Sequence, residues 1–221
     1  YFHGSALITL GLNSHRRWAS KLSAETGARV LNVGYRLAPQ AMIEEAVSDG
    51  LDAYRLVLAS GVDPQKVVFA GDSAGGLIAA DTTLAARDTG LPVPAAQVLL
   101  SALTSSDMNL KYNAMRESRD VLFPFMAVKY IYTVFATKNG THPVPQMPTE
   151  ADLHGIGPTL LNMSLTGAMG TAYVLLVGSD LNGPTLGAIF TVVGFWLLQH
   201  APHSFDIVFS KTPVSFCVEI S

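Results

Sequence analysis

The stretch KVVFAGDSAGG, Lys66 to Gly76, decides the fold of this chain. A β-branched and aromatic run leads up to Gly71, and an Ala/Leu-rich helical pattern follows to about Arg87. Gly71 and Gly75 carry no side chain on either side of the turn, so a strand can pass directly into a helix that packs against it. The pattern predicts a nucleophile elbow, in which Ser73 takes a strained conformation and holds its hydroxyl in the open.

Composition favours a single globular domain over residues 1–221. Of the 221 residues, 49% are hydrophobic and 14% are charged, which suits one α/β domain with an ample core. The net charge is −3, and no basic block occurs, so neither nucleic acid nor an anionic membrane surface is expected as a partner. The single cysteine, Cys217, excludes an intrachain disulfide and is compatible with a reducing compartment, so we expect a cytoplasmic protein.

Two features bear on targeting. The chain opens with Tyr1-Phe2-His3-Gly4 and has neither an initiator Met nor a signal peptide, so we expect the sequence to begin inside a larger protein. The uncharged run Leu181 to Gln199 is interrupted by Gly183-Pro184 and Gly194. Its unbroken apolar part, about thirteen residues, is too short to cross a bilayer. We therefore predict a buried helix there and no transmembrane span.

Strand and helix patterns alternate along the chain. Helices are predicted from Asn13 or Ser14 to about Glu25, ended by Gly27, and over Ile43 to Ala59; further strands are predicted at Arg29–Val33, Gln97–Leu100, Ala172–Val177 and Phe205–Phe209. This order predicts a mostly parallel central sheet with helices on both faces. Residues 101–160 have weaker patterns and are expected to form a substrate-side insertion over the C-terminal ends of the strands.

A serine nucleophile requires a base and an orienting carboxylate. His203 lies in a loop late in the chain and is the predicted base, with His200 as its rival. Asp180 follows a buried strand directly and is the predicted acid, with Asp152 as the alternative. The order Ser73, Asp180, His203 is the one expected for elbow hydrolases.

The developing oxyanion requires N–H donors. One is expected from Ala74, the residue after the nucleophile. The other is expected from a loop after an early strand, and the candidate is the opening segment with Gly4 and Ser5.

Four motifs carry a family resemblance. They are YFHGS at residues 1–5, NVGYRLAPQ at 32–40, VFAGDSAGG at 68–76 and APHSF at 201–205. Together they resemble the hormone-sensitive-lipase-like branch of the α/β hydrolases, especially its bacterial esterases, and the match is dense from Tyr1 to about Leu100. The resemblance implies the α/β-hydrolase fold and a carboxylester hydrolase that acts on small acyl esters through an acyl-enzyme, without a cofactor or metal.

The chain departs from the family pattern at several points. The family's oxyanion motif is His-Gly-Gly-Gly, whereas Ser5 and Ala6 follow Gly4 here, so a misplaced donor and weakened activity are expected if those positions need glycine torsions. Gly34 and Gln40 stand where the family has acidic residues, so a local charge network is expected to be missing. The family's N-terminal cap helices have no counterpart in the sequence.

The same residues are compatible with other functions. The same family includes ligand-binding receptors that keep the serine, and the altered oxyanion loop favours that alternative, whereas the presence of His203 favours an enzyme. A peptidase or amidase of the same fold would need stronger oxyanion donors than this loop offers. A second copy of the chain, forming a homodimer, is also a possible partner.

Overall fold

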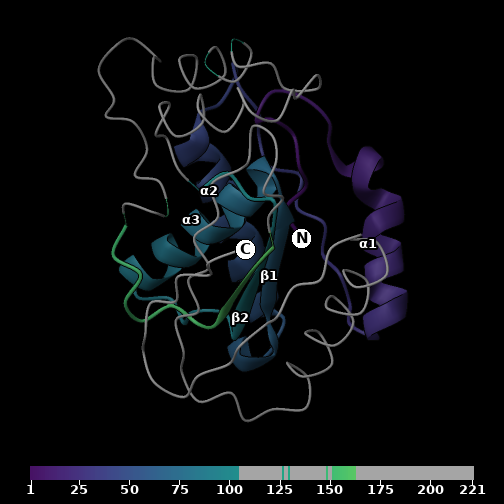
Figure 1. Ribbon diagram of the computed structural model, residues 1–221. Helices are drawn as coiled ribbons and strands as arrows, with labels where there is room; N and C mark the ends of the chain where they lie inside the picture. The colour runs from purple at the N-terminus through teal and green to yellow at the C-terminus, as the bar shows by residue number, and fades with distance from the viewer. Residues whose placement is uncertain (105–125, 127–128, 130–147, 149–150, 163–221) are drawn as a thin grey trace, which may run out of the picture.

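A three-stranded parallel sheet forms the centre of the computed structural model, which describes residues 1–104, 126, 129, 148 and 151–162 (Figure 1). Its strands are β1 (Val68–Asp72), β2 (Ala96–Leu100) and β3 (Thr159–Asn162), in the order β1-β2-β3. In the register, Val68 lies opposite Ala96, and Gln97 lies opposite Thr159. All three strands therefore end at the same edge of the sheet.

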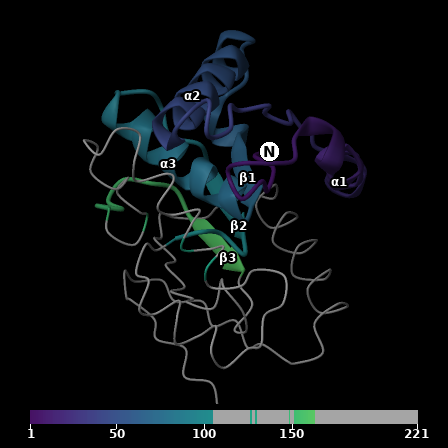
Figure 2. The same cartoon turned by 90° about the horizontal axis from the view of Figure 1, so that it is seen from above.

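Helices lie on both sides of these strands. They are α1 (Leu12–Thr26), α2 (Ile43–Ala59) and α3 (Ala74–Asp88), and a short 3₁₀ turn, η1 (Pro64–Lys66), precedes β1. The helix α3 packs against β1, β2 and α2. The helix α1 lies across the strands from α3 (Figures 1 and 2).

The core is centred on α3. Its Ala- and Gly-rich sequence has little side-chain volume, which allows the helix to approach the sheet closely, and Leu77 and Ile78 are fully buried. On α2, Tyr54 packs edge-on against Phe69 of β1, with ring centroids 4.9 Å apart. Phe2 packs against the same Phe69 at 5.6 Å and so joins the opening segment of the chain to the core.

Most of the local predictions within the described residues are confirmed. The predicted helix over Ile43–Ala59 has those bounds, the helix after Ser73 ends at Asp88, and the predicted strand Gln97–Leu100 is β2. Gly27 ends α1 in the left-handed conformation at φ 69° and donates its N–H to the carbonyl of Ser23.

Two local predictions were wrong, and one strand was missed. The helix α1 begins after Gly11, because Ser14, one of the two expected N-caps, lies inside the first turn and bonds back to Gly11. The strand at Arg29–Val33 is reduced to one bridge between Val33 and Phe2, since its neighbour is the short opening segment. β3 was not predicted, because its four residues follow a proline and show no alternation.

The predicted elements at Ala172–Val177, Leu181–Gln199 and Phe205–Phe209, and Cys217, lie outside the described residues. Within the described part of the chain, no helix is both long and apolar enough to cross a bilayer.

Candidate active site

Ser73 occupies a strained position between β1 and α3. Its φ and ψ are 54° and −123°, in a region that residues with a Cβ rarely adopt. Both of its backbone groups are bonded to the segment at the end of β2: its N–H donates to the carbonyl of Leu100 at 2.8 Å, and its carbonyl accepts from the N–H of Leu103 at 3.1 Å. These bonds hold the conformation, and Ser73 is only partly buried.

Two glycines make the turn sterically possible. A Cβ built on Gly71 would lie 2.4 Å from the carbonyl oxygen of Gly75. A Cβ on Gly75 would lie 2.1 Å from the carbonyl oxygen of Phe2 and 2.5 Å from that of His3. These contacts are with backbone atoms, which cannot rotate away as a side chain can. The predicted elbow is therefore present, with the first turn of α3 packed against the opening segment of the chain.

Residues His3 to Ala6 form a loop beside this turn, which we call the oxyanion loop. The Tyr35 hydroxyl donates to the carbonyl of His3 and is 2.9 Å from the Ser5 hydroxyl. The Ser5 hydroxyl also accepts the N–H of Leu7 at 2.8 Å. Burial raises the pKa of the Tyr35 phenol, which therefore stays protonated and able to donate.

The torsions of this loop test whether Ser5 and Ala6 can replace glycine. Ala6 and Leu7 have φ values of 47° and 63°, whereas Ser5 is not in the left-handed region. Ala6 therefore has a torsion that favours glycine, and Ser5 does not. The Ser5 side chain also makes two hydrogen bonds that glycine could not make.

The N–H groups in the loop differ in their partners. That of Gly4, one of the three predicted oxyanion donors, donates to Asp72 Oδ1 at 2.8 Å. Within the described residues, no acceptor is bonded to the N–H of Ser5 or of Ala74. Ala74 is the first residue of α3, where backbone N–H groups lack intrahelical partners and the helix dipole favours an anion.

The Asp72 carboxylate is the centre of a polar cluster next to Ser73. Its Oδ1 also accepts the Tyr1 hydroxyl at 2.6 Å, and its Oδ2 lies 3.4 Å from His15 Nε2 on α1. Burial, followed by the charge of Asp72, raises the pKa of the Tyr1 phenol, which keeps that group a donor. His3 is 1% exposed, and burial lowers the pKa of its imidazole.

Sequence reasoning missed this cluster. Asp72 lies inside the quoted motif, and its position beside the nucleophile is a signal of proximity to the site. Nothing in the spacing identifies Tyr1, Gly4 and His15 as its partners, because each is more than 50 positions away in the sequence.

The predicted base and acid lie outside the described residues, as does the rival base: His203, Asp180 and His200. The alternative acid, Asp152, lies within the described residues, and its hydrogen bonds are those of a residue that stabilises local structure. Its Oδ1 accepts the N–H of His154 at 2.9 Å, and its carbonyl accepts from Arg87 Nη1 at 2.5 Å. Within the same described part, no group of three His, Cys, Asp or Glu side chains could hold a metal ion.

The expected gap in charge pairing near Gly34 and Gln40 is partly filled. The Arg36 guanidinium donates to both oxygens of Asp49 on α2, at 2.8 Å from Nη2 to Oδ1 and 2.9 Å from Nε to Oδ2. Burial acts to raise the pKa of the Asp49 carboxyl, but the hydrogen bonds and charge of Arg36 outweigh it and lower that pKa overall. Arg36, in the YRLAP motif, therefore has a carboxylate partner of its own.

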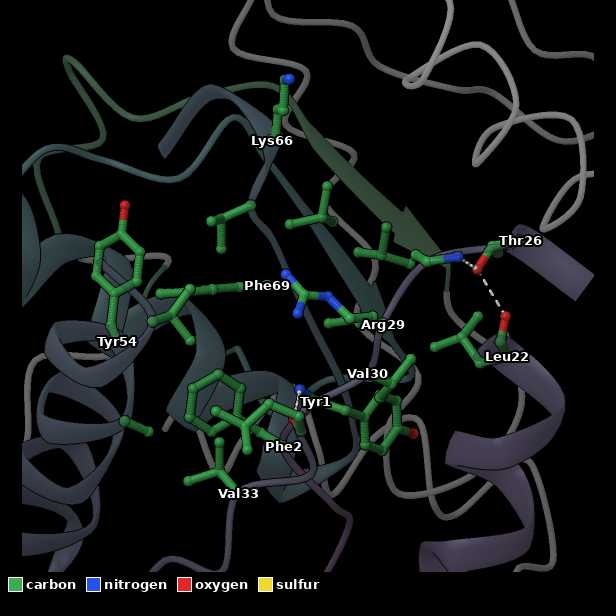
Figure 3. Close-up of a pocket in the computed structure, with 18 of the residues that line it drawn as sticks. Tyr1, Phe2, Leu22, Thr26, Arg29, Val30, Val33, Tyr54, Lys66 and Phe69 are labelled. Carbon is green, nitrogen blue, oxygen red and sulfur yellow. Dashed lines mark hydrogen bonds between the residues drawn. The ribbon is translucent and has the colours of Figure 1, made fainter. Parts of the chain in front are cut away.

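An apolar groove of about 740 Å³ lies between α1 and α2 (Figure 3). Tyr54 of α2, Phe69 of β1 and Leu22 of α1 are among the residues that line it. Ser73 is not among the lining residues. The groove therefore excludes the nucleophile, although Tyr1, whose hydroxyl donates to Asp72, is among its lining residues.

Family models match two overlapping parts of the chain. Residues 1–166 match a family described as "alpha/beta hydrolase fold". Residues 150–207 match a family described as "Protein of unknown function (DUF1576)". Asp180 and His203 lie in the second match, beyond the end of the first.

Curated relatives include bacterial esterases. The chain is 31% identical over 219 residues to the esterase LipU of Mycobacterium tuberculosis, covering 96% of this chain and 71% of that protein. It is 34% identical over 168 residues to an acetyl-hydrolase of Streptomyces hygroscopicus, covering 74% of this chain and 54% of that protein. The chain thus spans about half the length of the latter and about 70% of the former.

A solved structure has the same fold. The crystal structure of a hormone-sensitive lipase from a metagenome library superposes with a TM-score of 0.67 at 30% identity. The match covers 76% of this chain and 58% of that one. These findings confirm the predicted fold class and the resemblance.

Proposed function

Since the chain belongs to the alpha/beta hydrolase fold family, in its hormone-sensitive-lipase-like branch, we propose that it is a serine carboxylesterase acting on small acyl esters. The observation that carries the proposal is the conformation of Ser73. A serine at φ 54° between a strand and a helix, with Ala74 following it at the helix start, is the arrangement that a nucleophile elbow requires. Relatives named esterase and acetyl-hydrolase support the reaction class.

In the first half of the reaction, Ser73 Oγ attacks the ester carbonyl carbon and gives its proton to His203. Asp180 orients the imidazole and stabilises its positive charge. The C–O bond to the alcohol then breaks, and His203 returns the proton to the departing alcohol. Ser73 is left as an acyl ester. Water repeats the sequence, and the carboxylic acid leaves.

The oxyanion is assigned to the N–H groups of Ser5 and Ala74. Each has no bonded acceptor among the described residues, so each can donate without losing an existing bond. Gly4 would have to give up its bond to Asp72 to serve as a donor, and we therefore assign it the role of an anchor for the loop. Loss of one donor of this kind raises the activation barrier by about 3 kcal/mol.

A second candidate is a ligand-binding protein on the same fold. The observation that favours it is the match of residues 150–207 to the second family, because this segment contains both Asp180 and His203. In that case the elbow would be present without its base and acid. The two candidates make opposite predictions about turnover.

The test is hydrolysis of a short-chain p-nitrophenyl ester by the purified chain. Ser73→Ala and His203→Ala are measured beside it, with His200→Ala for the rival base and Ser60→Ala, an exposed serine just after α2, as the control. The esterase proposal predicts turnover that is lost in the first two variants and kept in the last two. Turnover no higher than that of Ser73→Ala would contradict it and favour the binding protein.

A serine-directed sulfonyl fluoride separates the nucleophile from the base. It is expected to modify Ser73 in the unaltered chain, and mass spectrometry of the digested protein locates the adduct. Modification that is spread over several serines at equal rates would contradict the assignment of Ser73.

A further inference from the structure

The carboxylate of Asp72 connects the two parts of the candidate site. Its residue immediately precedes Ser73, so its backbone belongs to the elbow. Its Oδ1 accepts the Gly4 N–H at 2.8 Å and the Tyr1 hydroxyl at 2.6 Å. Both donors belong to the opening segment that contains the oxyanion loop. The two hydrogen bonds therefore join the loop to the nucleophile turn directly.

Gly4 also lies close to the second carboxylate oxygen of Asp72, Oδ2. A Cβ built on Gly4 would lie 2.2 Å from Asp72 Oδ2 and 3.3 Å from the Asp72 carbonyl oxygen. Gly4 is not in the left-handed region, so its need for glycine comes from this approach and not from its torsions. The Gly4 peptide thus rests on the carboxylate, and a displacement of either residue displaces the other.

The charge of Asp72 is opposed by its neighbours. The Tyr1 hydroxyl and the Gly4 N–H both direct donors at it, and His15 Nε2 lies 3.4 Å from Oδ2. A bare negative charge beside Ser73 would oppose an oxyanion, since like charges at close range repel. We therefore expect the contribution of Asp72 to the site to come from the two hydrogen bonds that its Oδ1 accepts, and not from its negative charge.

We propose that Asp72 is a positioning residue, which fixes the N–H of Ser5 relative to the N–H of Ala74 through its hydrogen bond to Gly4. This inference rests on the proposed function. Asp72 touches no reacting atom. It acts through the loop, and its effect should appear only where the oxyanion forms, in the transition state.

The first test is a double-mutant cycle of Asp72→Ala and Gly4→Ala. Each change alone is expected to lower kcat about 100-fold, as loss of an oxyanion donor does, with KM changed less than about threefold. The two together are expected to cost little more than one, because both break the same contact. Asp72→Asn keeps an accepting oxygen for Gly4 and Tyr1, and it should stay within about fivefold of the unaltered kcat.

The matched control is Asp49→Ala, which removes a bonded carboxylate from α2 away from the elbow. It should leave kcat within about twofold. Equal losses in Asp49→Ala and Asp72→Ala, or a loss expressed mainly in KM, would overturn the positioning role and leave the esterase proposal intact.

A second readout does not depend on turnover. Hydrogen exchange of the peptide covering residues 1–7 should be faster in Asp72→Ala than in Asp72→Asn or Asp49→Ala, with similar melting temperatures in the three variants. Unchanged exchange in Asp72→Ala would overturn the inference even in a chain with no esterase activity. Failure of the proposed function appears separately, as absence of turnover and of Ser73 labelling in the unaltered chain.

Discussion

Gly75 of α3 lies directly against the backbone of Phe2, so closely that a Cβ on Gly75 would be 2.1 Å from the Phe2 carbonyl oxygen. Phe2 in turn bridges Gly71 of β1. The elbow and the opening segment therefore pack as one unit. They can approach this closely because Gly71 and Gly75 have no side chains.

Gly75→Ala and Gly71→Ala are therefore expected to destabilise the fold by about 3 kcal/mol or more, because the new methyl groups meet fixed backbone atoms. Gly11→Ala is the control. No heavy atom lies within 4 Å of a Cβ there, its backbone is extended, and the cost should stay below about 1 kcal/mol. Denaturant midpoints measure both. A similar loss in all three would contradict the steric explanation.

Ser73→Gly should separate stability from activity. The conformation of Ser73 is easy for glycine and costs other residues about 1–3 kcal/mol. After the higher entropy of glycine in the unfolded chain is counted, we expect Ser73→Gly to be about 1 kcal/mol more stable than Ser73→Ala. Both variants lack the hydroxyl and should be inactive. Thermal unfolding of the pair, side by side, measures the difference, and equal stabilities would limit the strain at Ser73 to the entropy cost of glycine, roughly 0.5–1 kcal/mol.

Ala6→Gly and Ser5→Gly should have opposite effects, although both restore the family's glycine. Ala6 is at φ 47°, so Ala6→Gly is expected to stabilise the fold by about 1 kcal/mol. Ser5 has ordinary torsions and two side-chain hydrogen bonds, so Ser5→Gly is expected to destabilise by about 1–2 kcal/mol. Chemical denaturation of both variants tests the signs. Stabilisation by both would contradict our account of the loop.

Asp81 on α3 should make stability depend on pH. Burial, followed by the charge of Glu44, raises the pKa of its carboxyl to about 8, and its Oδ1 is buried with no partner among the described residues. The unfolded carboxyl ionises near pH 4. Between about pH 4 and pH 8 the folded state therefore keeps a proton that the unfolded state releases, and stability falls as pH rises through this window.

The comparison that isolates this effect is Asp81→Asn against the unaltered chain. The stability advantage of the variant should grow from about pH 4 to pH 8, to on the order of 5 kcal/mol, and stay level above. Asp88→Asn, on the exposed end of the same helix, is measured beside it as the control. A constant difference across the range would contradict the burial of an uncompensated carboxyl at Asp81.

The parts of the fold that could be predicted from the sequence are those encoded by neighbouring residues. The strand before Ser73 and the helix after it follow from residue type and periodicity, and Gly71 and Gly75 follow from the steric needs of the turn. The bounds of α2 were likewise predicted from the helical spacing of its apolar residues. These elements hold the nucleophile, so the centre of the candidate site was accessible to sequence reasoning.

The parts that could not be predicted depend on tertiary contacts. Asp72 and Gly4 are 68 positions apart, and no periodicity relates them. The strand β3 has only four residues and takes its place by pairing with β2. Ser14 has the chemistry of an N-cap, yet it lies in the first turn because the chain turns at Gly11. The identity of the acid and the base stays a prediction.

The hydrogen bonds from Tyr1 and Gly4 to Asp72 also determine when the site can form. They close loops of 71 and 68 residues, and closing a flexible loop of that length costs about 4 kcal/mol of chain entropy. During synthesis Tyr1 and Gly4 emerge before β1, and their bonds to Asp72 cannot form until β1 follows. A chain refolding from denaturant should therefore regain its helical signal, which needs only local contacts, before it regains esterase activity.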